Sequence, residues 1–149
     1  MTRSLTAVDA RCSIARTLEV VGQKWTLLVV REALLGATRY ADFRSRLGIA
    51  PDVLADRLTT LVEHGILERR PYRDEGERER EEYVLTGAGR DLMPVLTAML
   101  QWGDAHRPTG DDPAGRSVQR ESGRPVRLTY VSEDGRELGA DEVQLVRRG

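Results

Sequence analysis

Apolar residues recur at helical spacing along most of the first hundred residues, which predicts a mainly helical chain. Segment 9–21 gathers Ile14, Leu18 and other apolar side chains on one face, as an amphipathic helix does. Segment 24–35 is apolar around most of its circumference, a pattern typical of a helix that packs on several sides. We expect this second segment to be the central core helix.

Two short amphipathic segments follow, joined by a tight link that starts at Gly48. The first, 39–47, has Thr38 as its expected N-cap, because a threonine hydroxyl accepts a hydrogen bond from a free amide of the first turn. The second, 51–64, begins with Pro51, and proline suits the first helical position, where no amide donor is needed. The pattern predicts a helix-turn-helix.

A charged hairpin is expected directly after these helices. Segments 66–70 and 82–85 have the composition of strands, and 73–81 between them is nearly all charge, with Gly76 at its centre. Such a loop is too polar for a core and suits an exposed wing. The order helix, turn, helix, hairpin predicts a winged helix-turn-helix, in which the second helix is held for a DNA groove.

A last helical region, 87–106, is expected to start after Thr86 as its N-cap and to break near Met93, because Pro94 lacks an amide proton and crowds the preceding turn. Its apolar stripe lies outside a compact winged-helix core. We therefore expect a homodimer through this region, aided by the helix at 9–21. The residues expected in the dimer interface are Ile14, Leu18, Val95, Leu96, Met99, Leu100 and Trp102.

The C-terminal residues predict a small β appendage. Strands are expected at 126–131 and 143–146, with a turn at Asp134-Gly135. A unit of two or three strands is marginal alone, so it should lean on the main domain or on a dimer partner. The expected class is α+β and mainly helical, with a DNA-binding and dimerisation domain at 9–106, a linker at 107–122 and the β extension at 123–149.

Composition narrows the class of protein. No apolar run reaches the roughly 18 residues that a membrane span needs, and no apolar segment of a secretion signal follows the N-terminus, so we expect no membrane association. Cys12 is the only cysteine among 149 residues, so an internal disulfide is impossible and a reducing cytoplasm is the simplest location.

The net charge of the chain is −1, so if it binds DNA its arginines must be concentrated on one part of the surface. Segment 39–73 holds seven arginines against five acids.

Six sequence blocks follow one another in order along residues 11–102. They are Cys12-Ser13-Ile14-Ala15-Arg16, Gly22-Gln23-Lys24-Trp25-Thr26, Arg39-Tyr40-Ala41-Asp42-Phe43, Leu54-Ala55-Asp56-Arg57-Leu58, Gly65-Ile66-Leu67-Glu68-Arg69 and Tyr83-Val84-Leu85-Thr86-Gly87-Ala88-Gly89. Together they resemble the HxlR-type winged-helix transcriptional regulators, relatives of the MarR group. The resemblance implies a bacterial, nucleoid-associated homodimer that binds palindromic operator DNA as a repressor.

Candidate DNA contacts come from the start of the first helix, from the second helix and from the wing. Exposed threonines can contact base edges, an acid can accept from a cytosine amino group, and arginines can reach phosphates or guanine. Asp52 has the alternative of a favourable first-turn charge on the helix dipole, Asp56 that of pairing with a neighbouring arginine, and the wing that of a solvated charge run. The candidates are Arg39, Tyr40, Pro51, Asp52, Ala55, Asp56, Arg57, Thr59, Thr60, Arg73 and Arg78.

Cys12 is the candidate for redox sensing, because several family members sense electrophiles or oxidants through a cysteine at this place. Its alternative is a small buried residue that packs the first helix. Trp25 and Trp102 are expected in the core and the interface, or else around a cavity for a small-molecule effector.

No catalytic pattern competes with DNA binding. His64 and His106 have no metal-ligand spacing, and there is no glycine-rich phosphate loop. We expect no enzyme, no metal and no cofactor; the appendage lacks the paired cysteines that some relatives carry, so a structural zinc is not expected. The competing hypothesis is a winged-helix interaction module without DNA binding, which the acids Asp52 and Asp56 on the second helix favour.

Overall fold

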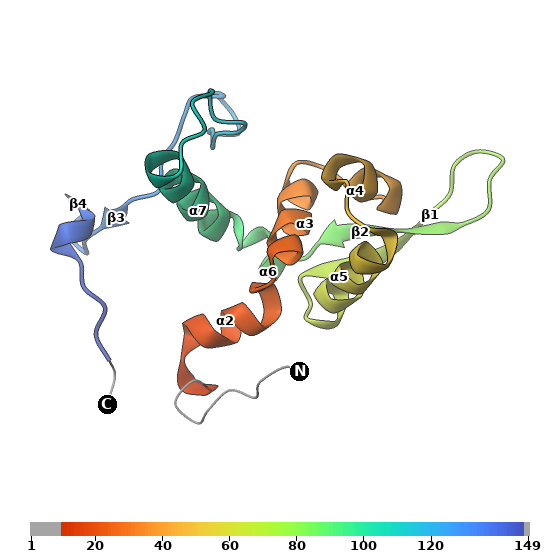
Figure 1. The fold of residues 1–149 in the computed structure, drawn as a ribbon, viewed down its shortest axis with the longest axis horizontal. Coiled ribbons are helices and arrows are strands. Elements are labelled where there is room, and N and C mark those ends of the chain that lie inside the picture. Colours follow the sequence, from red (N-terminus) through yellow and green to blue (C-terminus); the bar gives the residue numbers. More distant parts are fainter. Residues whose placement is uncertain (1–9, 148–149) are drawn as a thin grey trace. The chain divides into compact units, whose positions relative to one another are not determined.

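The computed structural model describes residues 10–147, so Asp9, the first residue of the first expected helix, lies outside the described part (Figure 1). The chain forms two compact units, one up to Met93 and one from Pro94 onward, which are described separately. The mainly helical α+β class and the winged helix-turn-helix are confirmed. The domain boundaries at 106 and 122 stay a prediction.

The first unit is built around α3, as its apolar circumference predicts. Its helices are α2 (Ser13–Val21), α3 (Lys24–Leu34), α4 (Tyr40–Leu47) and α5 (Pro51–Glu63). Helix α3 contacts α2, α4, α5 and strand β2. The largest fully buried apolar side chains, drawn from α3, α4, α5 and β1, are Val29, Val30, Phe43, Leu54, Leu58, Leu61 and Leu67.

The turn between α4 and α5 forms as its residues predict. Helix α4 ends at Gly48, whose φ of 60° lies in the left-handed region that glycine tolerates best, and Pro51 opens α5. The expected N-cap Thr38 is wrong by one residue, because Arg39 is the N-cap of α4. The Thr38 carbonyl instead accepts a 2.7 Å hydrogen bond from the Tyr83 amide, which ties this residue to the hairpin.

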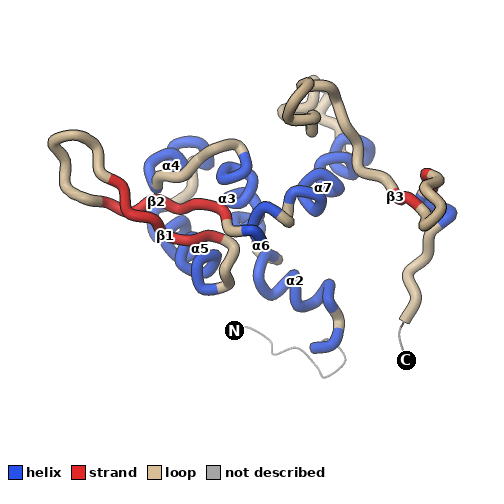
Figure 2. Tube along the Cα trace, turned by 180° about the vertical axis from the view of Figure 1, so that it is seen from behind, coloured by secondary structure: helices blue, strands red, loops and turns tan. Residues whose placement is uncertain are grey.

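Strands β1 (Leu67–Tyr72) and β2 (Arg80–Leu85) form the antiparallel hairpin seen in red in Figure 2. The register runs from Leu67 opposite Leu85 to Tyr72 opposite Arg80, so the strands extend toward the tip beyond the segments expected from the sequence. Residues 73–79 form the loop, which we call the wing. The Glu77 amide donates to the Asp74 carbonyl at 3.0 Å across the wing's turn.

The last helical region divides as the proline predicts. Thr86 is the N-cap of α6 (Gly87–Arg90), and its hydroxyl oxygen accepts a 3.1 Å hydrogen bond from the Gly89 amide. Helix α7 (Met93–His106) begins after a short turn. Pro94 therefore lies in the first turn of α7, where its missing donor costs nothing.

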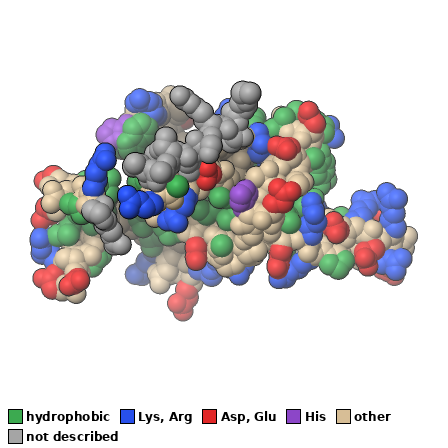
Figure 3. All heavy atoms as spheres, turned by 90° about the horizontal axis from the view of Figure 1, so that it is seen from below, with side chains coloured by type: hydrophobic (Ala, Val, Ile, Leu, Met, Phe, Trp, Pro, Cys, Tyr) green, Lys and Arg blue, Asp and Glu red, His purple; other side chains and the backbone are tan. Residues whose placement is uncertain are grey.

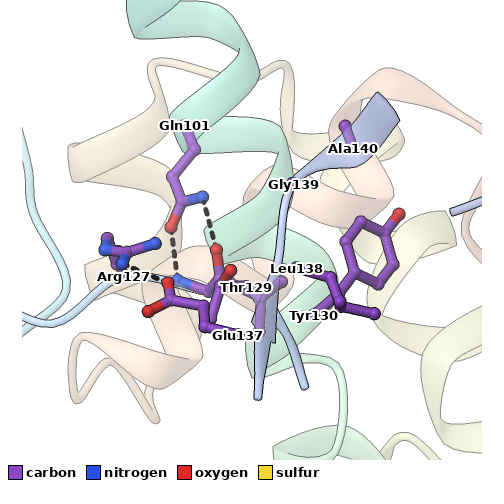
Figure 4. Close-up of a pocket in the computed structure, with 9 residues that line it drawn as sticks. Gln101, Arg127, Thr129, Tyr130, Glu137, Leu138, Gly139 and Ala140 are labelled. Atoms are coloured by element: carbon purple, nitrogen blue, oxygen red, sulfur yellow. Dashed lines mark hydrogen bonds and ion pairs between the residues drawn. The ribbon is translucent and has the colours of Figure 1, made fainter. Parts of the chain in front are cut away.

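The second unit packs irregular chain against one face of α7. The Gln101 side chain donates to the Leu128 carbonyl at 3.0 Å and accepts from the Leu128 amide at 2.5 Å (Figure 4). Thr97 shares a 3.0 Å hydrogen bond with Ser117. These contacts anchor the chain after α7 to this helix at two points, one in the expected linker and one in the extension.

The β appendage is smaller than its alternating sequence suggests. Strand β3 (Tyr130–Val131) pairs with β4 (Glu137–Leu138), with Gly135 at the turn, where φ is 83°. The expected strand at 143–146 is wrong, because the returning strand β4 starts six residues earlier, at Glu137, and the short 3₁₀ helix η1 (Ala140–Glu142) follows it. Of the strand expected at 126–131, only the last two residues form a strand, because only they pair with another strand, β4.

Candidate nucleic-acid interface

Helix α5 is packed against the core on one side and exposed on the other. Leu54, Leu58 and Leu61 are completely buried, and these positions lie on one side of the helix at about 100° per residue. The Tyr40 hydroxyl of α4 donates a 3.0 Å hydrogen bond to the Pro51 carbonyl. The start of α5 is thus held to the start of α4 by a side chain and not by packing alone.

The opposite side of α5 is a continuous polar face. The residues on it, exposed along its whole length, are Asp52, Ala55, Asp56, Thr59 and Glu63, with Pro51 exposed at the helix start. Thr60 is half-buried beside this face. A rigid helix with an exposed face of small and polar side chains is the form in which a winged helix-turn-helix offers a helix to the major groove.

Arg57 lies beside that face and is mostly buried. Its side chain is only 20% exposed and donates to the Asp56 carboxylate at 2.6 Å, while its Nε atom is buried without a hydrogen-bond partner among the described residues. The alternative that Asp56 pairs with a neighbouring arginine is therefore confirmed. A contact from Arg57 to DNA stays a prediction and would require this pair to open.

Arg39 occupies the junction between α4 and the wing. Its two terminal nitrogens donate to the two Asp74 carboxylate oxygens, each at 3.0 Å, and its guanidinium carbon lies 4.2 Å from the centre of the Tyr72 ring. The hydrogen bonds with Asp74 are the largest effect that raises the pKa of Arg39 above its ordinary value. Asp74 and Tyr72 were not among the residues singled out from the sequence.

The wing carries arginines and acids in close mixture (Figure 3). Arg73 donates through Nε to the Glu77 carbonyl at 2.7 Å, which helps to close the loop, and Arg78 is exposed. Arg80 pairs with Glu77 at 3.0 Å. Four acids (Asp74, Glu75, Glu77 and Glu79) outnumber the two arginines of the wing, so its formal net charge is −2. Phosphate binding requires positive charge, which only the individual arginines of the wing can supply.

Cys12 lies exposed at the N-cap of α2. The alternative of a buried packing residue is wrong, because Cys12 itself is exposed. The apolar side chains of Ile14 and Leu18 on α2 are 60% and 57% exposed. The thiol is therefore open to reagents, and the exposed apolar face of α2 is open to a partner.

Helix α7 has a second face beside the one that holds the extension. Val95, Met99 and Trp102 follow one another at helical spacing and are 39%, 52% and 57% exposed. Leu96 and Leu100 are half-buried. An unpartnered apolar stripe of this kind is typical of an interface.

An open cavity of about 430 Å³ lies in the first unit, between α2, the end of α5 and the segment that follows α6. Neither Trp25 nor Trp102 lines it, and an effector cavity at the tryptophans stays a prediction. The lining residues are Ser13, Arg16, Thr17, Val20, Val21, His64, Ile66 and Leu92.

Residues 10–147 contain neither a metal-binding cluster nor a membrane-spanning helix. No group of three or more His, Cys, Asp or Glu side chains could hold a metal ion there. No helix in this part of the chain is long and apolar enough to cross a membrane.

The geometry agrees with comparison to known proteins. The model of the HxlR-like helix-turn-helix matches residues 20–111. The chain belongs to this family. The residues that match the HxlR model span α3, α4, α5, the wing and α7, and so include the whole candidate nucleic-acid interface.

Relatives agree with the assignment. The uncharacterized HTH-type transcriptional regulator Rv3095 of Mycobacterium tuberculosis is 45% identical over 101 residues, which are 68% of this chain and 63% of that protein. The chain thus matches less than two thirds of that relative's length. The uncharacterized HTH-type regulator YybR of Bacillus subtilis is 32% identical over 100 residues, 64% of this chain and 76% of YybR.

Solved structures differ in how much of this chain they match. PA1607, described as a candidate transcription factor, is 41% identical, with a TM-score of 0.80 over 93% of this chain and 96% of its own. The redox regulator HypR in its reduced form is 32% identical, with a TM-score of 0.56 over 63% of this chain and 92% of its own. This HxlR-family chain therefore shares nearly its full length with PA1607 and a shorter region with HypR.

Proposed function

We propose that this HxlR-family protein is a sequence-specific DNA-binding transcriptional regulator, acting as a repressor on palindromic operator DNA at the nucleoid. The observation that carries the proposal is the exposed polar face of α5, fixed from behind by three fully buried leucines. Thr59 and Ala55 lie at the centre of this face, where a hydroxyl and a methyl group suit base edges.

Phosphate contacts position such a helix, and the arginines around α5 supply them. Arg39 at the start of α4 and Arg73 and Arg78 in the wing flank the helix in the chain's order of elements. Three arginines in each protomer give about six phosphate contacts in a dimer, enough for a strong dependence of affinity on salt.

A homodimer supplies the second recognition helix. The exposed stripes of α2 (Ile14, Leu18) and α7 (Val95, Met99, Trp102) are the surfaces proposed to bury on dimerisation. Two α5 helices related by a two-fold axis would then read half-sites about one helical turn apart, which is why we propose a palindromic operator.

A signal is proposed to act through the exposed Cys12 thiol or through a small molecule. HypR, a structural neighbour, is named a redox regulator, and Cys12 lies at the start of α2, next to the proposed dimer surface. Oxidation there would change the spacing of the two α5 helices to the extent that it stabilises one state of the dimer over the other.

The test is fluorescence anisotropy on duplex DNA from the protein's own upstream region and on a shuffled duplex of equal length. Thr59→Ala should lower the preference for the upstream duplex about tenfold, the order of one lost base contact. Thr109→Ala, the same change in the loop after α7, should leave it unaltered. An unchanged preference in Thr59→Ala would reject α5 as the reading helix.

The redox part has its own experiment. Diamide should weaken binding of the wild type and leave Cys12→Ser unaffected; equal weakening in both proteins would remove Cys12 from the mechanism.

The acidic residues Asp52 and Asp56 favour a second candidate, a winged-helix module that binds protein and not DNA. Both carboxylates lie on the exposed face of α5, where they would repel phosphates. This candidate predicts no salt-dependent binding to either duplex.

A further inference from the structure

The Arg39 guanidinium is held on two sides at once. The guanidinium carbon lies over the Tyr72 ring, 4.2 Å from its centre, and the two terminal nitrogens at the edge of the group donate hydrogen bonds of 3.0 Å to the Asp74 carboxylate. Face and edge are separate surfaces of a planar group, so the partner on the edge can change while the ring stays in place.

A carboxylate and a phosphate present the same pair of acceptors to an arginine edge. The Arg39 and Asp74 side chains are 43% and 54% exposed, so a phosphate can reach the edge without opening the core. Arg39 is also the N-cap of α4, the helix that crosses the DNA backbone in a helix-turn-helix.

We propose that Asp74 is an internal competitor for DNA phosphate, which holds the Arg39 edge in the free protein and gives it up when DNA binds. The inference rests on the proposed DNA binding. Asp74 thereby sets the affinity for DNA independently of sequence, because a phosphate contact from Arg39 must first displace the carboxylate.

The competing role for Asp74 is a strut that holds the wing in shape. The wing has other closures: Arg73 Nε donates to the Glu77 carbonyl at 2.7 Å, and the Glu77 amide donates to the Asp74 carbonyl at 3.0 Å. The strand register continues to Tyr72 opposite Arg80. These bonds do not use the Asp74 carboxylate, so its loss should free Arg39 and leave the loop closed.

The two roles predict opposite effects of Asp74→Asn on duplex affinity, measured by anisotropy at a fixed, moderate salt concentration. Glu77→Gln is the matched control, because it removes the same charge from the same loop where Glu77 pairs with Arg80. Asp74→Asn should bind the upstream and shuffled duplexes roughly three- to tenfold more tightly, and Glu77→Gln less than about twofold. In the Arg39→Ala background, Asp74→Asn should gain no more than Glu77→Gln does.

Each other outcome overturns the proposal in a recognisable way. Weaker binding by Asp74→Asn would make Asp74 a strut. Equal gains from Asp74→Asn and Glu77→Gln, or a full gain that persists without Arg39, would reduce the effect to net charge. Wild-type protein that binds neither duplex would overturn the proposed function itself, and this inference with it.

Discussion

Gly89 of α6 lies against Ile66, the residue directly before β1, and it offers a sharp test of the packing that supports the hairpin. A Cβ atom added at Gly89 would lie 2.3 Å from the Ile66 carbonyl oxygen and 2.8 Å from Leu85 Cδ2. The Ile66 carbonyl cannot retreat freely, because it accepts a 3.1 Å hydrogen bond from the Thr86 amide. Gly89→Ala must therefore push α6 away from the hairpin.

Gly87 in the same short helix is the matched control, since a Cβ there meets nothing within 4 Å. An open helical Gly→Ala change stabilises by about 0.4–1 kcal/mol through the unfolded chain, whereas overpacking against fixed backbone costs about 1–3 kcal/mol. We expect Gly87→Ala to be slightly more stable than wild type and Gly89→Ala about 1–2 kcal/mol less stable.

Urea denaturation followed by circular dichroism measures the difference in stability, which we expect to be about 1.5–3 kcal/mol between the two variants. Near 150 residues this corresponds to roughly 3–12 °C in Tm. Equal stability of Gly87→Ala and Gly89→Ala would refute the close approach of α6 to the Ile66 carbonyl.

Four further predictions follow from single side chains. Leu58→Ala, at a completely buried position of α5, should cost about 2–5 kcal/mol in urea denaturation; a cost below 1 kcal/mol would contradict its burial. Thr86→Val removes the acceptor for the Gly89 amide and should lower the free energy of unfolding by about 0.5–2 kcal/mol in the same assay; an unchanged stability would show that the cap is not formed. Gln101→Leu removes both hydrogen bonds to Leu128 and should speed amide exchange at Leu128 without changing exchange in α5; unaltered exchange at Leu128 would count against the anchor. Met99→Glu, in the exposed stripe of α7, should dissociate the proposed dimer in sedimentation velocity, while Glu121→Gln should not; a persistent dimer would move the interface elsewhere.

The helical part of the fold could be predicted from the sequence because its signals are local. Gly48 and Pro51 mark the end of one helix and the start of the next by backbone preference alone, and the leucine spacing assigns the buried face of α5. The break before α7 likewise follows from the geometry of Pro94. These features need no knowledge of distant contacts.

The remaining errors all depend on distant partners. Thr38 has the composition of an N-cap, but its carbonyl is bound to Tyr83, 45 positions later in the sequence. The strand expected at 143–146 has the right alternation and no neighbour to pair with, since Glu137–Leu138 is the segment that the turn brings back.

The site shows the same division between local and distant signals. The exposed positions of α5 follow from helical periodicity, whereas the pairing of Arg39 with Asp74 joins residues 35 positions apart. An arginine in a charged loop or at a helix end has many acids nearby in sequence, and only the folded structure determines which of them it pairs with. Tyr72 and Asp74 could have been suspected from their place at the base of the wing, but no pattern singles them out.

The central claim is that this HxlR-family chain binds duplex DNA through α5 and the arginines around it. The most direct measurement is wild-type affinity for the upstream duplex over a salt series by fluorescence anisotropy. About six phosphate contacts in a dimer predict a slope of log K against log salt near −5, with tighter binding to the upstream duplex than to a shuffled one. Affinity that is absent or flat with salt on both duplexes would contradict the account.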